Sequence, residues 1–204
     1  MKKHIVIATL IAFAGLSSLT AEARNMDAPR VNRSAAVQTP LAAEAAATLL
    51  WMREEEKLAR DVYQTLYAQW KQPVFQRIAR SEQRHFDAIG KRIAQFNLAD
   101  PALAATGVFS QAELQDLYDQ LVFTGTQGYV QALTVGATIE DMDIADLLAA
   151  IDETTDPALK RTYGNLLDGS KNHLRAFVTL LRGQGTDYTP VHIDPELFDA
   201  IMGD

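Results

Sequence analysis

The sequence predicts an all-α protein, a bundle of four helices with one long crossover between helices two and three. Three observations carry this prediction. Apolar residues recur at the three- and four-residue spacing of a helix face along four long segments. Proline and glycine stand at the segment boundaries, and no segment alternates apolar and polar residues as a strand would. Short links join segments one to two and three to four, whereas roughly 30 residues separate two from three.

The first 23 residues have the pattern of a secretory signal peptide. Lys2 and Lys3 precede an apolar run, residues 5–19, and Ala21-Glu22-Ala23 forms a small-x-small cleavage site. The apolar run is short for a membrane-spanning helix, which needs roughly 20 apolar residues. We therefore expect cleavage after Ala23 and an exported, periplasmic protein without a membrane partner; an uncleaved membrane anchor is the alternative.

The composition excludes several classes of function. The chain contains no cysteine, which excludes disulfides, thiol nucleophiles, zinc-thiolate sites and cysteine-ligated iron–sulfur or rubredoxin centres. Its net charge is −7, and loss of the signal peptide would make it −8. An acidic balance of this size argues against a nucleic-acid partner.

The first two helices follow a leader. Residues 24–39 are small and polar without periodicity, so we expect a flexible leader before a helical domain of residues 40–185. Thr39-Pro40 offers an N-cap and a first-turn proline for a helix through Trp70. Pro73 separates this helix from a second one, residues 74–97, and the short link requires an antiparallel hairpin.

The crossover carries a short helix of its own. Asp100-Pro101 and Gly107 mark a loop. Ser110 and Glu113 then have the spacing of a capping box, which predicts a helix through about Phe123.

The second half repeats the hairpin. Helix three is expected over residues 127–152, and Asp156-Pro157 opens a fourth helix that ends near Gly183-Gln184-Gly185. In the tail, residues 186–204, Asp194-Pro195-Glu196 starts one or two final turns.

Two polar side chains interrupt the predicted buried face of helix two. Glu82 and His85 lie one turn apart on a stripe that otherwise consists of apolar residues: Phe75, Ile78, Ile89, Ile93 and Phe96. Burying a carboxylate and an imidazole costs several kcal/mol unless a partner or a metal compensates. The pair therefore indicates either metal ligation or internal pairing.

The other helices show the same interruption. Glu140 and Asp143 lie one turn apart on the inward stripe of helix three, and His173 lies mid-stripe on helix four. On helix one, a helical wheel places Glu55 well inside the apolar arc and Glu56 near its edge, so spacing alone leaves both open. We expect the rest of the acidic run at residues 54–56 to be solvated.

The residue types indicate the kind of metal. Carboxylate oxygens with one imidazole per hairpin suit iron or manganese, with zinc also compatible. Two ions bridged by carboxylates would match the charge of so many buried acids. Internally hydrogen-bonded pairs are the alternative for any single motif taken alone.

These motifs resemble the ferritin-like superfamily, the rubrerythrin and ferritin four-helix bundles. The resemblance is closest to a bacterial and archaeal family known only as a domain of unknown function, and it covers residues 41–181. Four segments carry it: Glu55-Glu56-Lys57-Leu58-Ala59-Arg60-Asp61-Val62-Tyr63, Ser81-Glu82-Gln83-Arg84-His85, Ile139-Glu140-Asp141-Met142-Asp143-Ile144 and Ser170-Lys171-Asn172-His173-Leu174-Arg175-Ala176-Phe177.

The resemblance implies a ligand set. A first-helix glutamate seven residues before a tyrosine selects Glu56 with Tyr63, and we expect Tyr63 in the core, bonded to a ligand carboxylate. The expected metal ligands are Glu56, Glu82, His85, Glu140, Asp143 and His173.

One position departs from the family pattern. The fourth helix of these proteins also carries Glu-x-x-His, and here the glutamate position holds Ser170. Asp143, one turn from Glu140, is expected to supply the oxygen from the neighbouring helix. The alternative is that the second metal position is weak or empty.

The resemblance also implies a function. We expect a non-haem di-iron, or iron–manganese, oxidoreductase that oxidises Fe(II) or reduces peroxide, with two iron ions as cofactor. Dioxygen or peroxide would be its reactant, and the lack of cysteine would require an external electron donor for peroxide reduction. The alternatives are a protein that sequesters metal without turnover and a helical interaction module with a decayed site; a homodimer is left open.

Overall fold

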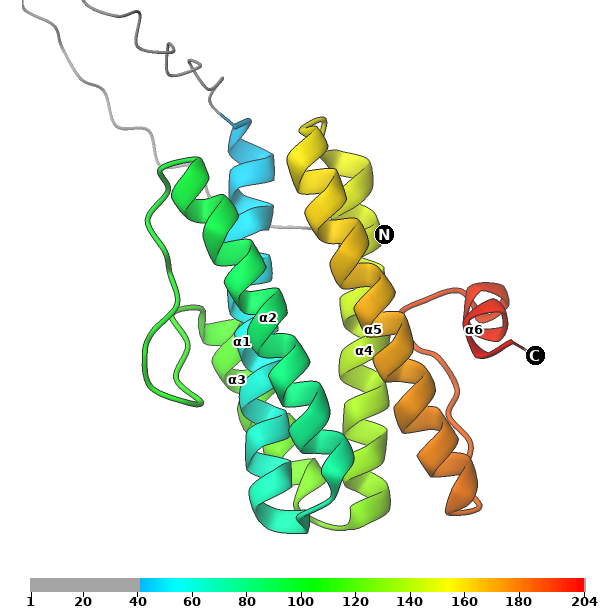
Figure 1. Cartoon of the computed structure of the whole chain (residues 1–204). Helices are drawn as coiled ribbons and strands as arrows, with labels where there is room; N and C mark the ends of the chain where they lie inside the picture. The colour runs from blue at the N-terminus through cyan, green and yellow to red at the C-terminus, as the bar shows by residue number, and fades with distance from the viewer. Residues whose placement is uncertain (1–40, 204) are drawn as a thin grey trace, which may run out of the picture. The chain divides into compact units, whose positions relative to one another are not determined.

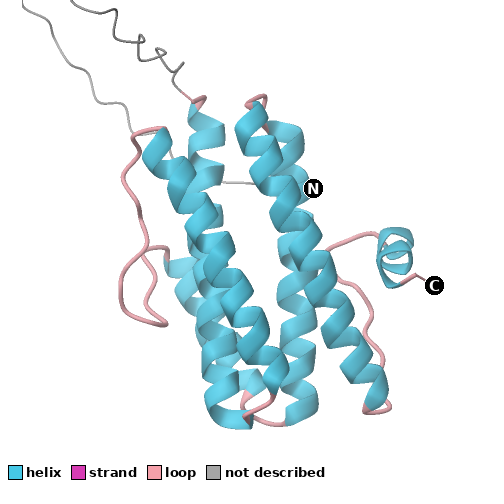
Figure 2. Ribbon diagram, viewed as in Figure 1, coloured by secondary structure: helices cyan, strands magenta, loops and turns pink. Residues whose placement is uncertain are grey.

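The computed structural model describes residues 41–203, and in this range the chain forms six helices and no strand (Figures 1 and 2). Four helices are long: α1 (Ala43–Trp70), α2 (Pro73–Gln95), α4 (Tyr129–Glu153) and α5 (Pro157–Gly183). Two are shorter: α3 (Ala112–Gly125) and α6 (Pro195–Met202). The all-α prediction is confirmed. None of the helices in residues 41–203 is long and apolar enough to cross a membrane.

Two predictions concern only residues outside the described range, the signal peptide at residues 1–23 and the leader at 24–39, and they stay predictions. Thr39 and Pro40 also lie outside it, but the helix start predicted there is wrong, because residues 41 and 42 are not helical and α1 begins at Ala43 with Ala42 as its N-cap.

The long helices form two hairpins. α1 ends where Lys71 takes a left-handed conformation, φ 55°, and α2 begins with Pro73 in its first turn. α2 packs along α1, and α5 packs along α4 (Figure 1). Contacts of α1 with α4 and of α2 with α5 join the hairpins around one apolar core. The crossover returns through α3, which packs against α1 and α4.

The local cap signals at two later helices are confirmed. The Asp156 carboxylate accepts hydrogen bonds from the N–H groups of Ala158 and Leu159 at 2.8 and 2.9 Å, which caps α5. Asp194 caps α6 in the same way, accepting from Glu196 N at 2.8 Å.

The capping box predicted at Ser110 is wrong. α3 begins two residues later, at Ala112, and its N-cap residue Gln111 makes no side-chain cap. Ser110 instead donates from Oγ to Glu54 Oε2 at 2.6 Å and from its backbone N–H to Glu54 Oε1 at 2.8 Å. The Ser110 hydroxyl therefore bonds a buried carboxylate on α1 and does not cap α3.

The prediction of a solvated acidic run on α1 is also wrong, because the crossover covers Glu54 and the other two glutamates are buried as well. Glu54 is fully buried, and Glu55 and Glu56 are 7 % and 1 % exposed. Lys57, 1 % exposed, donates to Asp61 Oδ2 at 2.7 Å and to two crossover carbonyls, of Ala105 and Val108. These buried charges fix the crossover to α1.

The tail is held by one buried aspartate on α4. Asp141, fully buried, accepts hydrogen bonds from Tyr188 Oη at 2.9 Å and from the backbone N–H groups of Val191, His192 and Ile193 at 2.6 to 3.0 Å. The His192 side chain is exposed.

Candidate metal centre

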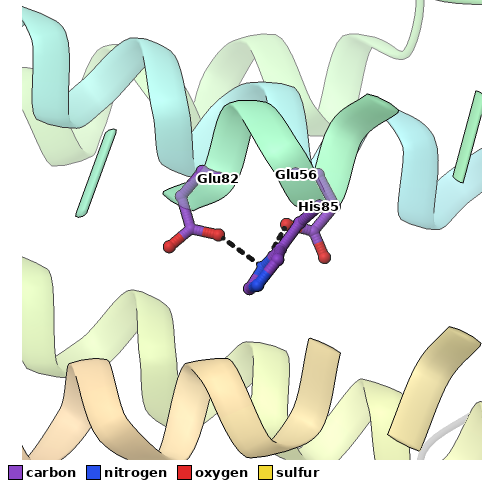
Figure 3. A group of neighbouring side chains, drawn as sticks. All are labelled: Glu56, Glu82 and His85. Atoms are coloured by element: carbon purple, nitrogen blue, oxygen red, sulfur yellow. Dashed lines mark ion pairs between the residues drawn. The ribbon is translucent and has the colours of Figure 1, made fainter. Parts of the chain in front are cut away.

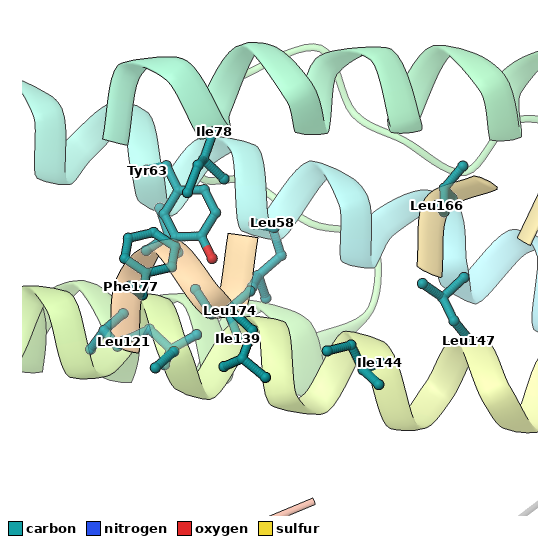
Figure 4. Packing of buried hydrophobic residues seen from close by; sticks show 14 of the residues in the cluster. Leu58, Tyr63, Ile78, Leu121, Ile139, Ile144, Leu147, Leu166, Leu174 and Phe177 are labelled. Atoms are coloured by element: carbon teal, nitrogen blue, oxygen red, sulfur yellow. The ribbon is translucent and has the colours of Figure 1, made fainter. Parts of the chain in front are cut away.

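The inward face of α2 supplies the middle of the site. Glu82 is 1 % and His85 8 % exposed, and apolar Phe75, Ile78 and Ile89 lie on the same face. On one side, the rings of Tyr63, Phe75 and Phe177 pack with centroids 5.3 to 6.5 Å apart (Figure 4 shows Tyr63 and Phe177). The polar groups are therefore held in an apolar, low-dielectric surrounding, where each needs a partner.

One group of ligand atoms comes from the first hairpin. His85 Nδ1 lies 2.8 Å from Glu82 Oε2 and 3.3 Å from Glu56 Oε2. Figure 3 shows these three side chains, which extend from α1 and α2 toward the second hairpin.

A second group joins the two hairpins and shares Glu82 with the first. His173 Nδ1 lies 2.7 Å from Glu82 Oε1 and 3.4 Å from Glu140 Oε2. The imidazole rings of His85 and His173 are stacked, with centroids 5.6 Å apart. Each oxygen of Glu82 therefore faces a different imidazole, which is the arrangement of a carboxylate that bridges two ions.

The short contacts are ion pairs in which the donor and acceptor atoms are poorly aligned for hydrogen bonds. Six buried side-chain polar atoms in residues 41–203 have no hydrogen-bond partner, and four of them belong to this cluster: Glu56 Oε1, Glu82 Oε1, His85 Nδ1 and His173 Nδ1. The ligand atoms of each group lie within 4.8 Å of one another, close enough to hold a metal ion between them.

The spacing also fits a metal ion. Ligand atoms about 2.1 Å from one ion at an angle of about 90° are about 3.0 Å apart. The four imidazole-to-carboxylate distances, 2.7 to 3.4 Å, lie around this value. The residues present therefore fit two ions that share Glu82.

Without metal, the imidazoles carry protons. Burial alone lowers the pKa of His85, but the carboxylates of Glu56 and Glu82 outweigh it and raise the pKa to about 11. Glu140 and Glu82 likewise overcome the burial of His173 and raise its pKa to about 10. Burial raises the pKa of Glu82, yet the two imidazoles lower it to about 2. A metal ion at this cluster would therefore have to compete with protons for the same nitrogens.

Tyr63 orients one carboxylate of the second group. As predicted, it is buried in the core, fully so, and Oη donates to Glu140 Oε1 at 2.6 Å. Burial and the nearby carboxylates of Glu140 and Glu82 raise the Tyr63 pKa. The phenol thus keeps its proton, and one oxygen of Glu140 is fixed while Oε2 faces His173.

Asp143 lies beside the two groups rather than within either. The Ser170 hydroxyl donates to Asp143 Oδ2 at 2.5 Å. Burial and the charges of Glu56 and Glu140 raise the Asp143 pKa, which places this carboxyl close to both groups. Five of the six predicted ligand residues lie in the two groups, and the sixth, Asp143, accepts a hydrogen bond from the residue that replaces the expected glutamate.

Of the two glutamates left open on α1, Glu56 lies in a group of side chains that could hold a metal ion, and Glu55 does not. Glu55 has different neighbours: burial and then the charge of Asp146 raise its pKa, and a side-chain hydrogen bond with Trp51 partly opposes them. Sequence reasoning missed Asp146, although it lies three residues after Asp143 on the same stripe of α4; that spacing was the available signal.

Fold and centre together define a helical protein with a buried carboxylate–imidazole cluster. Residues 45–204 match the family model of DUF2202, an uncharacterized protein domain, and the chain belongs to this family. A curated relative is uncharacterized protein MJ0754 of Methanocaldococcus jannaschii, 48 % identical over 164 residues, which cover 80 % of this chain and 89 % of that protein. The crystal structure of hypothetical protein MJ0754 from Methanococcus jannaschii matches with a TM-score of 0.81 at 46 % identity, covering 84 % of this chain and 98 % of that one.

Proposed function

We propose that the chain is a ferritin-like four-helix bundle with one long crossover, and that its core binds two metal ions and acts as a non-haem di-iron, or iron–manganese, oxidoreductase. One observation carries the proposal. The two oxygens of Glu82 lie 2.7 and 2.8 Å from two different imidazole nitrogens, neither of which has a hydrogen-bond partner. A single ion or an internal ion pair does not require a carboxylate shared in this way.

The residues divide into two ligand sets. Glu56 and His85 would hold one ion, Glu140 and His173 the other, and Glu82 would bridge them. Asp143 would add an oxygen between the sets. Two such ions supply one-electron redox chemistry toward dioxygen or peroxide.

The proposed reaction needs electrons from outside the chain, since no cysteine can supply a rubredoxin-like donor. Oxidation of Fe(II) meets this need, because Fe(II) is then the substrate and the reductant. Two Fe(II) ions give two electrons, and one hydrogen peroxide with two protons accepts them to form two water molecules.

The test compares Glu82→Gln with Glu113→Gln, which changes an exposed glutamate on α3. We expect the wild type and Glu113→Gln to oxidise Fe(II) or consume peroxide at the same rate. Glu82→Gln should lose at least about 100-fold, since neither ion keeps its shared ligand. Equal rates for all three proteins would refute the proposed activity.

A second candidate, sequestration of metal without turnover, is favoured by one contact. Ser170 occupies the position of an expected carboxylate and donates to Asp143 Oδ2 at 2.5 Å. In this candidate Asp143 stays bonded to Ser170, and the centre has one oxygen ligand fewer than in the first candidate. This candidate predicts tightly bound metal and no absorption change when oxygen meets the Fe(II) form. A fast optical change on adding oxygen favours the oxidoreductase.

We also propose export with cleavage after Ala23. The proposal rests on the charged, apolar and small-residue pattern of residues 1–23. A mature N-terminus at Arg24, measured by mass spectrometry on protein from a bacterial periplasm, supports it; an intact N-terminus in the cytoplasm contradicts it.

A further inference from the structure

Gly169 on α5 lies against the imidazole of His85. A Cβ built at Gly169 would lie 2.6 Å from His85 Nε2 and 2.7 Å from Cε1, closer than real Cβ contacts come. Any other residue at this position therefore forces the ring to move. Glycine in the middle of a helix lowers helix stability relative to alanine, so a close approach explains its presence here.

The contact determines where Nδ1 of His85 lies. With the Nε2–Cε1 edge against Gly169, Nδ1 is 2.8 Å from Glu82 Oε2 and 3.3 Å from Glu56 Oε2. Ordinary Cβ contacts begin at 3.4 Å, so an added methyl group would push the rigid ring back by about 0.8 Å. Metal–ligand distances tolerate only about 0.2 Å.

The effect is confined to one of the two imidazoles. The same Cβ would lie 3.9 Å from His173 Cε1, an ordinary van der Waals contact. The group of Glu82, Glu140 and His173 therefore has room for the methyl group, and the group of Glu56, Glu82 and His85 does not.

We propose that Gly169 is a positioning residue of the metal centre. Its missing side chain lets the His85 ring lie where Nδ1 binds, so that one ion position depends on Gly169 and the other does not. The metal part of this inference rests on the proposed function, whereas the steric coupling between Gly169 and His85 rests on the contact geometry alone.

The first test measures metal per chain in Gly169→Ala beside Gly164→Ala. Gly164 lies on the same helix, and a Cβ there meets nothing within 4 Å. We expect two ions in the wild type and in Gly164→Ala, and one ion in Gly169→Ala. The Co(II) spectrum of Gly169→Ala should lose the bands of the His85 position and keep those of the His173 position.

The second test uses metal-free protein and a double variant. Gly169→Ala should lower the thermal midpoint by roughly 2–10 °C through overpacking, whereas Gly164→Ala should raise it by about 1–3 °C through helix propensity. In a His85→Ala background the ring is gone, so Gly169→Ala should now raise the midpoint as Gly164→Ala does. A general packing role for Gly169 would lower it in both backgrounds.

Several outcomes overturn the inference. They are two ions and an unchanged Co(II) spectrum in Gly169→Ala, loss of both ions from a folded Gly169→Ala protein, and an equal fall of the midpoint with and without His85. If Gly169→Ala does not fold, the double variant Gly169→Ala/His85→Ala replaces it in the test. A folded double variant supports the steric contact between residue 169 and the His85 ring, and an unfolded double variant refutes it. If the wild type binds no ion, both the proposed function and the role of Gly169 in metal binding are refuted. The thermal midpoints of Gly169→Ala with and without His85→Ala then test only the steric contact between Gly169 and His85.

Discussion

At the residue scale, Glu82 is the side chain on which both ligand groups depend. Its oxygens face His173 Nδ1 at 2.7 Å and His85 Nδ1 at 2.8 Å. Although burial raises its pKa, the two imidazoles lower it to about 2, so the carboxylate is ionised at every physiological pH. A permanently charged carboxylate between two nitrogens is available as a bridge without first losing a proton.

The raised histidine pKa values predict how metal-free stability depends on pH. The folded-state pKa values of His85 and His173, about 11 and about 10, lie above the ordinary value of 6.5. Their contribution to the free energy of unfolding is therefore fully present below about pH 6.5 and is lost as the pH rises through 10 and 11.

Urea unfolding in the presence of a chelator, from pH 6 to pH 11, measures this dependence. We expect the wild type to lose at least about 1 kcal/mol more than a His85→Gln/His173→Gln variant over that range. Parallel pH profiles for the two proteins would show that the imidazoles are not protonated in the folded chain.

The same protons predict the stoichiometry of metal uptake. Metal binds neutral imidazole, so loading both positions at pH 7 should release about two protons per chain, with a further fraction from Glu56. Burial raises the Glu56 pKa to about 7 against the opposing effect of His85, so this carboxyl is partly protonated there. A pH indicator in weakly buffered solution measures the release during titration with Zn²⁺, and uptake without proton release would contradict the assigned protonation.

Substitution by glutamine should have different effects on metal binding at the neighbouring residues Glu55 and Glu56. Burial and Asp146 raise the Glu55 pKa, so its charge opposes folding at neutral pH, and Glu55→Gln should stabilise the metal-free protein by about 1 kcal/mol and keep both ions. Glu56→Gln should lose the ion at the His85 position. The metal content and urea unfolding of the two variants test this prediction. Loss of metal from Glu55→Gln would show that Glu55, and not Glu56, is the ligand.

At the element scale, α1 carries two polar faces. One presents Glu56 to the metal centre, and the other presents Glu54, Lys57 and Asp61 to the crossover. Both are buried, and for this reason the apolar periodicity of α1 is a poor guide to which of its acids point inward. The α2 stripe, with only Glu82 and His85 as polar members, is easier to interpret.

The buried cation of α1 predicts a large effect on the crossover. Lys57 Nζ bonds Asp61 Oδ2, Ala105 O and Val108 O at 2.7, 2.9 and 3.1 Å. Lys57→Met leaves these acceptors without their shared donor and should cost about 3–5 kcal/mol of unfolding free energy. Urea unfolding and protease cleavage within residues 99–111 measure it, and a loss below about 1 kcal/mol would show that the ion pair does not anchor the crossover.

Local signals predicted the helices well, and tertiary contacts account for the errors. All five expected helices within residues 41–183 occur with ends within three residues of those predicted, because proline, glycine and the Asp156 cap act on their own neighbours. The Ser110 box and the solvated Glu54 were wrong because these two residues bond each other across 56 positions, which no local pattern reveals. The grouping of Glu56 rather than Glu55 with Glu82 and His85 likewise depends on contacts with another helix.

At the scale of the whole described domain, the centre joins its two halves. The α1–α2 hairpin supplies Glu56, Glu82 and His85, and the α4–α5 hairpin supplies Glu140 and His173. Ions bound between them would hold the hairpins together, and binding to the folded state alone stabilises it by mass action. Saturating metal should therefore raise the thermal midpoint, and a chelator should reverse the rise.

The most direct measurement is metal content per chain by mass spectrometry, on protein prepared with iron, manganese, zinc and copper all present, beside Glu82→Gln. We predict two ions per wild-type chain, iron or manganese, and a loss of both from the variant because Glu82 is shared. No bound ion in the wild type, or equal metal content in the two proteins, would contradict the account and leave the buried carboxylates and imidazoles as internal ion pairs.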